Sequence, residues 1–228
     1  MGLPFTLEQF LDVFARYNQQ VWPVQLVLIA LALTAVHLAL RPGPGGGWAV
    51  ATILALLWGW TAVAYHWSFF TRVNPAAYAF GGVFMLQAAL LLFAGDLRAL
   101  WFQPRRDAAG IAGWVLVAYA LVGYPLVGWL AGHRYPAAPT FGVPCPTTIF
   151  TLGVLLGLQG RPARRLFVIP VLWAAAATVA ALQLGMTEDL GLPAAALAAV
   201  VLVMRKRGAV RSSPGPRAAS VEPEPAHG

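Results

Sequence analysis

The sequence predicts an all-α fold: an integral membrane helical bundle of about seven transmembrane helices, preceded by a short N-terminal amphipathic helix. Three observations predict it. Of the 228 residues, 59% are hydrophobic and only 10% are charged, whereas a soluble domain carries about 25% charged residues. The mean hydropathy is +0.69. Apolar runs alternate with short segments rich in glycine, proline and arginine. Lipid must therefore solvate most of the surface.

The predicted spans are apolar runs that approach the ~20 residues a helix needs to cross a bilayer. They are residues 21–40, 48–70, 78–94, 111–131, 147–158, 166–184 and 190–204. The fifth and seventh runs are short and need a thin bilayer or cover from neighbouring loops. We expect three regions: an interfacial helix over 1–20, a seven-helix transmembrane domain over 21–207 and a disordered cytoplasmic tail over 208–228.

The N-terminal segment has the pattern of a short amphipathic helix. Thr6 and Gln9 have the spacing of a capping box, and Glu8 and Asp12 fall on its polar side. Its apolar residues follow helical spacing: Leu7, Phe10, Leu11 and Phe14. Two placements fit this pattern. The helix either lies on the outer membrane surface or folds over the mouth of the bundle as a lid.

The basic residues predict the orientation. Twelve of the fifteen arginine and lysine residues fall in the tail and the loops of one side, and only Arg16, Arg72 and Arg134 fall on the other. Positive charge marks the cytoplasmic side. We therefore expect the N-terminus outside and the C-terminus in the cytoplasm. The abundance of arginine, alanine and glycine indicates a GC-rich bacterial genome, and hence a bacterial inner membrane.

Small residues predict where helices pack closely. Gly153 and Gly157 form a GxxxG pattern on the fifth run, and Ala176 with Ala180 offers a similar small face on the sixth. Pro125 lies within the fourth run and predicts a kink there.

Polar residues gather in the loops of the outer side, and topology brings these loops to one face. A solute or ion site and ordinary solvated loops would both give this pattern. The candidate ligand-binding residues are His66, Arg72, Asn74, His133, Tyr135, Thr147, Thr148, Glu188 and Asp189.

The proline-rich segment 136–146 leads to Cys145, the single cysteine. Pro146 suits the first position of a helix, which would make Cys145 the N-cap and expose its thiol to the positive end of the helix dipole. Cys145 is therefore the candidate catalytic residue, paired with His66 or His133. The same three residues are candidate ligands for zinc or copper, although their spacing is not typical of a metal site. Cys145 as a simple capping residue is the third interpretation. No cofactor motif is evident.

Three segments resemble a known family: FTLEQFLDVFARYN at 5–18, NPAAYAFGGVFMLQ at 74–87 and YPAAPTFGVPCPTTIFTLG at 135–153. Together they are similar to an uncharacterised family of small bacterial multi-pass membrane proteins, a domain of unknown function whose members are sometimes labelled permeases. The resemblance covers most of the chain without its tail. It implies a helical bundle in a bacterial membrane and supplies no catalytic residues.

Three functions therefore stay open. The first is a permease-like protein that binds a solute or ion on its outer face. The second is a structural or accessory subunit of other membrane proteins. The third, and least favoured, is a membrane enzyme or redox protein that uses Cys145. The expected partners are the lipid bilayer and a small solute or ion. Nucleic acid is excluded, because no soluble basic face exists to bind it.

Overall fold

The computed structural model describes residues 2–41, 45–93, 106–158 and 163–211, with side chains up to residue 203. These residues are helical and contain no strand, which confirms the predicted all-α class. The tail 212–228, and with it most of the predicted disordered region, lies outside the described residues.

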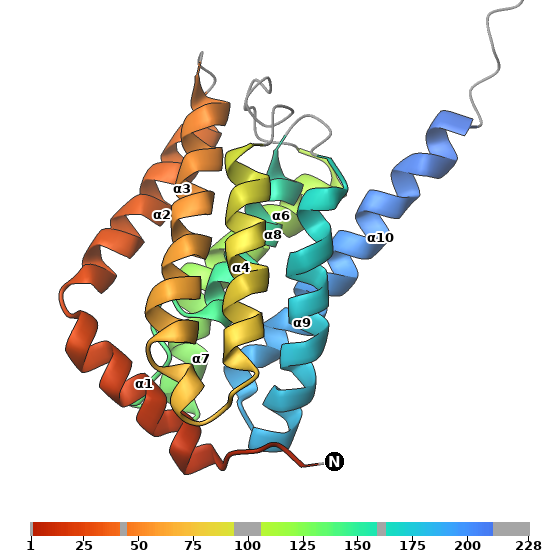
Figure 1. Ribbon diagram of the computed structural model, residues 1–228. Coiled ribbons are helices and arrows are strands. Elements are labelled where there is room, and N and C mark those ends of the chain that lie inside the picture. The colour runs from red at the N-terminus through yellow and green to blue at the C-terminus, as the bar shows by residue number, and fades with distance from the viewer. Residues whose placement is uncertain (1, 42–44, 94–105, 159–162, 212–228) are drawn as a thin grey trace, which may run out of the picture.

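Every predicted apolar run coincides with a helix (Figure 1). The α-helices are α1 (Leu7–Val21), α2 (Val24–Leu40), α3 (Gly46–Trp60), α4 (Ala77–Leu92), α6 (Ala108–Ala118), α7 (Tyr124–Leu130), α8 (Pro144–Gly157), α9 (Arg165–Leu184) and α10 (Gly191–Arg211). The short elements are the π-helices η1 (Thr61–Trp67) and η3 (Tyr119–Gly123) and the 3₁₀ turns η2 (Phe70–Arg72) and η4 (Thr187–Leu190).

Among the residues that the structure describes, three helical segments are long and apolar enough to cross a membrane: Gly46–Arg72, Ala108–Leu130 and Arg165–Leu184. The bent pair α1–α2 raises this number to four if it is one span, and α4 and α8 are shorter apolar helices. The apolar side chains on the outside fit such a setting, because Leu172, Leu182 and Leu197 are each more than 60% exposed.

Helix α8 lies in the interior of the bundle, and all fourteen of its residues are buried. The predicted GxxxG pattern is the reason it fits. A Cβ atom added to Gly153 would lie 2.7 Å from the carbonyl oxygen of Gly113 on α6, and one added to Gly113 would lie 2.4 Å from the backbone nitrogen of Gly157. The backbones of α6 and α8 are therefore in direct contact.

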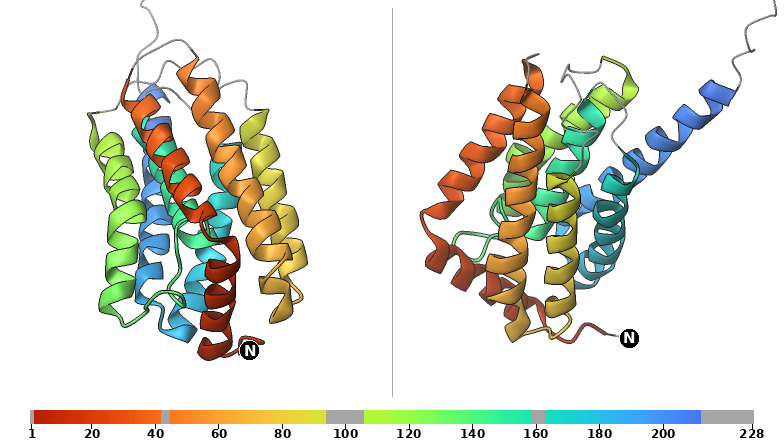
Figure 2. Two further views of the ribbon diagram at one scale, coloured as in Figure 1. Left: turned by 90° about the vertical axis from the view of Figure 1, so that its left-hand side faces the viewer. Right: turned by 45° about the horizontal axis from the view of Figure 1, so that its top comes forward.

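Each π-helix interrupts one of the long segments: η1 follows α3, and η3 separates α6 from α7. Both segments end on the side of the bundle where α1 lies (Figures 1 and 2). η3 ends at Gly123, two residues before Pro125, which sits in the first turn of α7. Proline lacks an N–H and its ring crowds the preceding turn, so a wider turn there relieves the clash. Where the sequence predicts a kink at Pro125, the structure thus has a π-helix just before α7, a feature that often marks functional sites.

Helix α1 crosses the end of the bundle at 89° to α2, as Figure 1 shows. Its predicted capping box is present. Phe14, Tyr17 and Asn18 are buried, and the Tyr17 hydroxyl accepts a hydrogen bond of 2.7 Å from Trp60 Nε1. Helix α1 therefore packs against the end of the bundle, as in the second of the two predicted placements, and we call it the lid.

Asn18 fastens this lid to the segment between α7 and α8. Its Nδ2 donates to the carbonyl oxygens of Pro136 at 2.6 Å and Ala138 at 2.7 Å, while its Oδ1 accepts from the Thr140 hydroxyl at 2.7 Å. One buried amide thus joins two segments that are about a hundred residues apart in the sequence.

We expect Asn18→Asp to release the lid. The variant keeps the acceptor for Thr140 but places a carboxylate oxygen against two carbonyl oxygens, at a cost of about 2–3 kcal/mol. Amide hydrogen exchange over α1 should become faster, whereas exchange in α9 should not change. Gln19→Glu adds the same charge to an exposed position of α1 and is the control. Equal exchange in both variants would contradict the role of Asn18.

Candidate functional site

A cavity of about 150 Å³ lies between the lid and the bundle. Its walls come from the segment before α1, from α1 itself, from η1 to α4, from the start of α8 and from α9, and they are mostly aromatic rings and alanine side chains. The lining residues are Leu3, Phe5, Phe10, Phe14, Tyr65, Phe70, Asn74, Phe80, Pro144, Cys145, Trp173, Ala176, Ala177, Ala180, Ala181, Leu184 and Asp189.

Asp189 supplies the carboxyl group of this cavity. Its side chain is buried, with 4% exposed, and its Oδ1 accepts a hydrogen bond of 2.5 Å from the Tyr124 hydroxyl. The Cys145 thiol also donates to it. Burial raises the pKa of Asp189 to about 6, although the hydrogen bond from Tyr124 opposes this shift. The group therefore changes charge close to physiological pH.

Glu188, the preceding residue, forms a separate buried pair. Its Oε1 lies 2.7 Å from Nδ1 of His133, and its side chain is fully buried. Its Oε2 has no hydrogen-bond partner. The backbone carbonyl of Glu188 accepts from the Tyr119 hydroxyl at 2.6 Å. The two carboxyl groups thus have different partners, although they are adjacent in sequence.

The turn that carries both acids is held by the π-helical segment beside it. Tyr119 begins η3 and Tyr124 directly follows it. η3 therefore sets the spacing between the two tyrosines, whose hydroxyls both donate hydrogen bonds to residues of η4. Gly191 permits this contact, because a Cβ there would lie 2.2 Å from the Tyr119 ring. The second π-helix, η1, carries Tyr65, which also lines the cavity.

His66 lies behind the cavity wall rather than in it. It is fully buried and its ring packs against Phe84, with 4.6 Å between ring centroids, and against Trp173, at 5.2 Å. Neither ring nitrogen has a hydrogen-bond partner. Because Trp173 lines the cavity, His66 supports a wall residue and does not itself reach the space.

The remaining predicted ligand-binding residues divide into two groups. Asn74 lines the cavity, and Thr147 and Thr148 are buried in the first turn of α8 with hydroxyls that lack partners. Arg72 and Tyr135 lie elsewhere. The Arg72 guanidinium is exposed over the Phe69 ring, and Tyr135 is 59% exposed, beside a groove of about 300 Å³ between α2 and α7.

The predicted position of Cys145 was wrong. The N-cap of α8 is Val143, and Pro144 occupies the first helical position. Both Pro144 and Pro146 suit a helix start, and the earlier one is used. Cys145 is buried and donates its thiol proton to a carboxylate. This arrangement suits a hydrogen-bond donor better than a nucleophile.

The residues predicted as metal ligands are held apart by their own partners. His133 pairs with Glu188, His66 is enclosed by aromatic rings, and Cys145 pairs with Asp189. Within the described ranges, no three histidine, cysteine or acidic side chains come close enough together to hold a metal ion.

Sequence reasoning missed Tyr119 and Tyr124, and it gave the rings of α1 no part in the site. Both tyrosines lie in an apolar run, where a hydroxyl in the interior requires a partner. That requirement, together with Pro125 beside Tyr124, was the available signal. For Phe10 and Phe14 the signal was the amphipathic pattern of α1 itself.

No curated protein and no solved structure matches the chain. A family model of unknown function matches residues 7–213, a range that contains the lid, both π-helices and the acidic turn. The chain therefore belongs to the family of unknown function DUF6064, in agreement with the resemblance to an uncharacterised family seen in its sequence.

Proposed function

We propose that this protein is a permease-like membrane protein that binds a small solute in the cavity beneath α1. The observation that carries the proposal is the cavity beneath α1. It is about 150 Å³ in volume, it has a buried carboxyl group at one wall, and a separate helix covers it. Apolar pockets with a few polar groups are the usual form of small-molecule sites.

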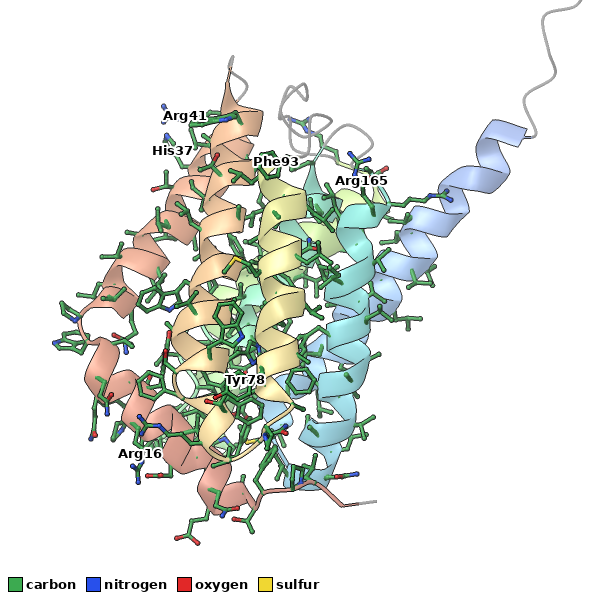
Figure 3. All side chains as sticks on the ribbon, viewed as in Figure 1. Arg16, His37, Arg41, Tyr78, Phe93 and Arg165 are labelled. Atoms are coloured by element: carbon green, nitrogen blue, oxygen red, sulfur yellow. The ribbon has the colours of Figure 1, made fainter. Side chains whose placement is uncertain are left out.

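In this proposal the bundle crosses a bacterial inner membrane seven times, with the lid outside. Arg41 and Arg165 lie at one end of the bundle and Arg16 at the other, as Figure 3 shows. Arg164 directly precedes Arg165, and Arg106 lies just before α6, which begins at the same end (Figure 1). This end therefore carries the excess of positive charge expected in the cytoplasm. Helix α8 is too short to cross the bilayer alone, and segment 131–143 completes this crossing. Irregular backbone of this kind is tolerated where protein covers it.

Solute binding is favoured over the two other functions. A purely structural subunit needs neither an internal cavity nor a buried carboxyl group, both of which are costly within a membrane. An enzyme that uses Cys145 needs a base to activate the thiol. The partner of Cys145 is Asp189, and both histidines proposed as bases have other surroundings.

Cys145 reports on the cavity because it lines it and is the single cysteine. We expect a membrane-impermeant thiosulfonate to modify Cys145 slowly in intact cells and about 10-fold faster in Asn18→Asp, where the closed state is less populated. Benzyl alcohol, a neutral probe of suitable size, should slow the modification in both proteins.

Two single-cysteine controls in a Cys145→Ala background fix the topology. Arg134→Cys should react at once in intact cells, and Arg41→Cys only after permeabilisation. The reverse pattern would invert the proposed orientation. If benzyl alcohol gives no protection and the lid variant reacts at the wild-type rate, the cavity is not a binding site.

A further inference from the structure

We infer that the solute is an organic monocation, a protonated amine with a small apolar body, whose ammonium group pairs with the Asp189 carboxylate. This inference rests on the proposed function and narrows it to one class of ligand. It follows from the charge, the walls and the volume of the cavity.

The charge of the cavity is negative or zero. Asp189 is the single acidic residue among its lining residues, and no arginine, lysine or histidine of the described chain lines it. A buried carboxylate without a cationic partner is costly, and a bound ammonium group supplies that partner. An anionic solute would face the carboxylate with no positive group to offset it, so the cavity selects against it.

The surroundings of Asp189 complete this account. The groups that face it are Tyr124 on α7, Cys145 on α8, Glu188 on the same turn and His133 from the segment between α7 and α8. Tyr65 of η1 and Tyr119 of η3 also interact electrostatically with Asp189. His133, the one basic group in this set, lies 2.7 Å from the carboxyl group of Glu188. Asp189 is thus left with hydroxyl and thiol donors, and a cation can still pair with it.

The walls fit the rest of such a molecule. Phe5, Phe10 and Phe14 approach from the lid side, and Phe80 and Trp173 from the bundle. Faces of aromatic rings attract cations and also bury an apolar body. A cavity of about 150 Å³ is the size that accommodates one benzene ring in a protein interior. Benzylammonium therefore matches the charge, the apolar body and the approximate volume.

A proton competes with the cation for the same carboxylate. Because the pKa of Asp189 is about 6, the group is ionised at pH 7.5 and mostly protonated at pH 5. Affinity for benzylammonium, which stays charged throughout this range, should therefore fall about 10-fold between these two pH values. Affinity for a neutral probe should not fall.

The test is isothermal titration of the purified full-length protein in detergent with three probes of one size: benzylammonium, benzyl alcohol and benzoate. At pH 7.5 we expect benzylammonium to bind at least about 10-fold more tightly than benzyl alcohol, and benzoate not to bind. Asp189→Asn keeps an acceptor for Tyr124 and should lower the affinity for benzylammonium by about 30-fold or more. The control is Asp12→Asn, which removes an exposed carboxylate of the lid and should change nothing.

The outcomes separate this inference from the proposed function. If benzyl alcohol binds as tightly as benzylammonium, the cavity is a binding site and the cationic class is wrong. Preferred binding of benzoate would overturn the inference directly, in the wild-type protein and without any variant. An equal decrease in the affinity for benzylammonium in Asp12→Asn and Asp189→Asn would place the cation outside the cavity. If no probe binds and none protects Cys145, both proposals fail.

Discussion

Gly153→Leu is expected to prevent assembly of the bundle. Even the first carbon of the new side chain would lie 2.7 Å from the Gly113 carbonyl oxygen and 2.9 Å from the backbone nitrogen of Val117. These are backbone atoms of α6, so no rotamer change relieves the clash. Overpacking by a single methyl group costs about 1–3 kcal/mol, and leucine adds three further carbons. Since α8 is buried along its whole length, the helices around it would have to separate.

Size-exclusion chromatography and thermal unfolding of the detergent-solubilised protein measure this effect. We expect Gly153→Leu to aggregate and Gly153→Ala to form a monodisperse but less stable protein. Gly82→Leu is the control, because a Cβ on that glycine of α4 meets no atom within 4 Å. A monodisperse Gly153→Leu protein with the wild-type midpoint would show that α6 and α8 are not in backbone contact.

The sequence is sufficient to locate the helices but not to show which of their faces are buried. Leu155 on α8 is 2% exposed and Leu172 on α9 is 63% exposed, yet both are leucines within apolar runs. Hydrophobic periodicity normally separates such positions. It carries little information when the surroundings of the bundle are as apolar as its interior. Small residues carried the information instead, and Gly153 and Gly157 correctly indicated the close contact.

The candidate site was predictable where polar residues were concentrated in loops. Glu188 and Asp189 stand out because they are acids between two apolar runs, and the structure buries both. Arg72 and Tyr135 were chosen by the same reasoning but are exposed and do not line the cavity. The sequence pattern predicts on which side of the bundle these residues lie. It does not predict the direction in which each side chain points.

The lid was ambiguous for a different reason. An amphipathic helix needs an apolar surface to cover, and a bilayer and the end of a bundle both provide one. What distinguishes them is Asn18, a polar residue among the buried positions of α1. Its three hydrogen bonds reach a segment about 120 residues away in the sequence. A single sequence does not reveal a partner at that distance.

His133→Ala is expected to be the most damaging single change at the acidic turn. The Glu188 side chain is fully buried and its Oε2 already lacks a partner. Loss of the imidazole would leave Oε1 without one as well. Breaking a buried pair of this kind costs about 3–5 kcal/mol, because the remaining polar group stays buried and unpaired. Thermal unfolding of the detergent-solubilised protein should show a large decrease in the midpoint.

The double variant His133→Ala/Glu188→Gln distinguishes this cause from simple loss of packing. Glutamine has the same shape as glutamate without its ionisable group, so the double variant should recover part of the lost stability. If His133 only fills space, the two losses should add instead. Arg134→Ala, one residue further on, leaves the His133–Glu188 pair intact and should change the midpoint much less.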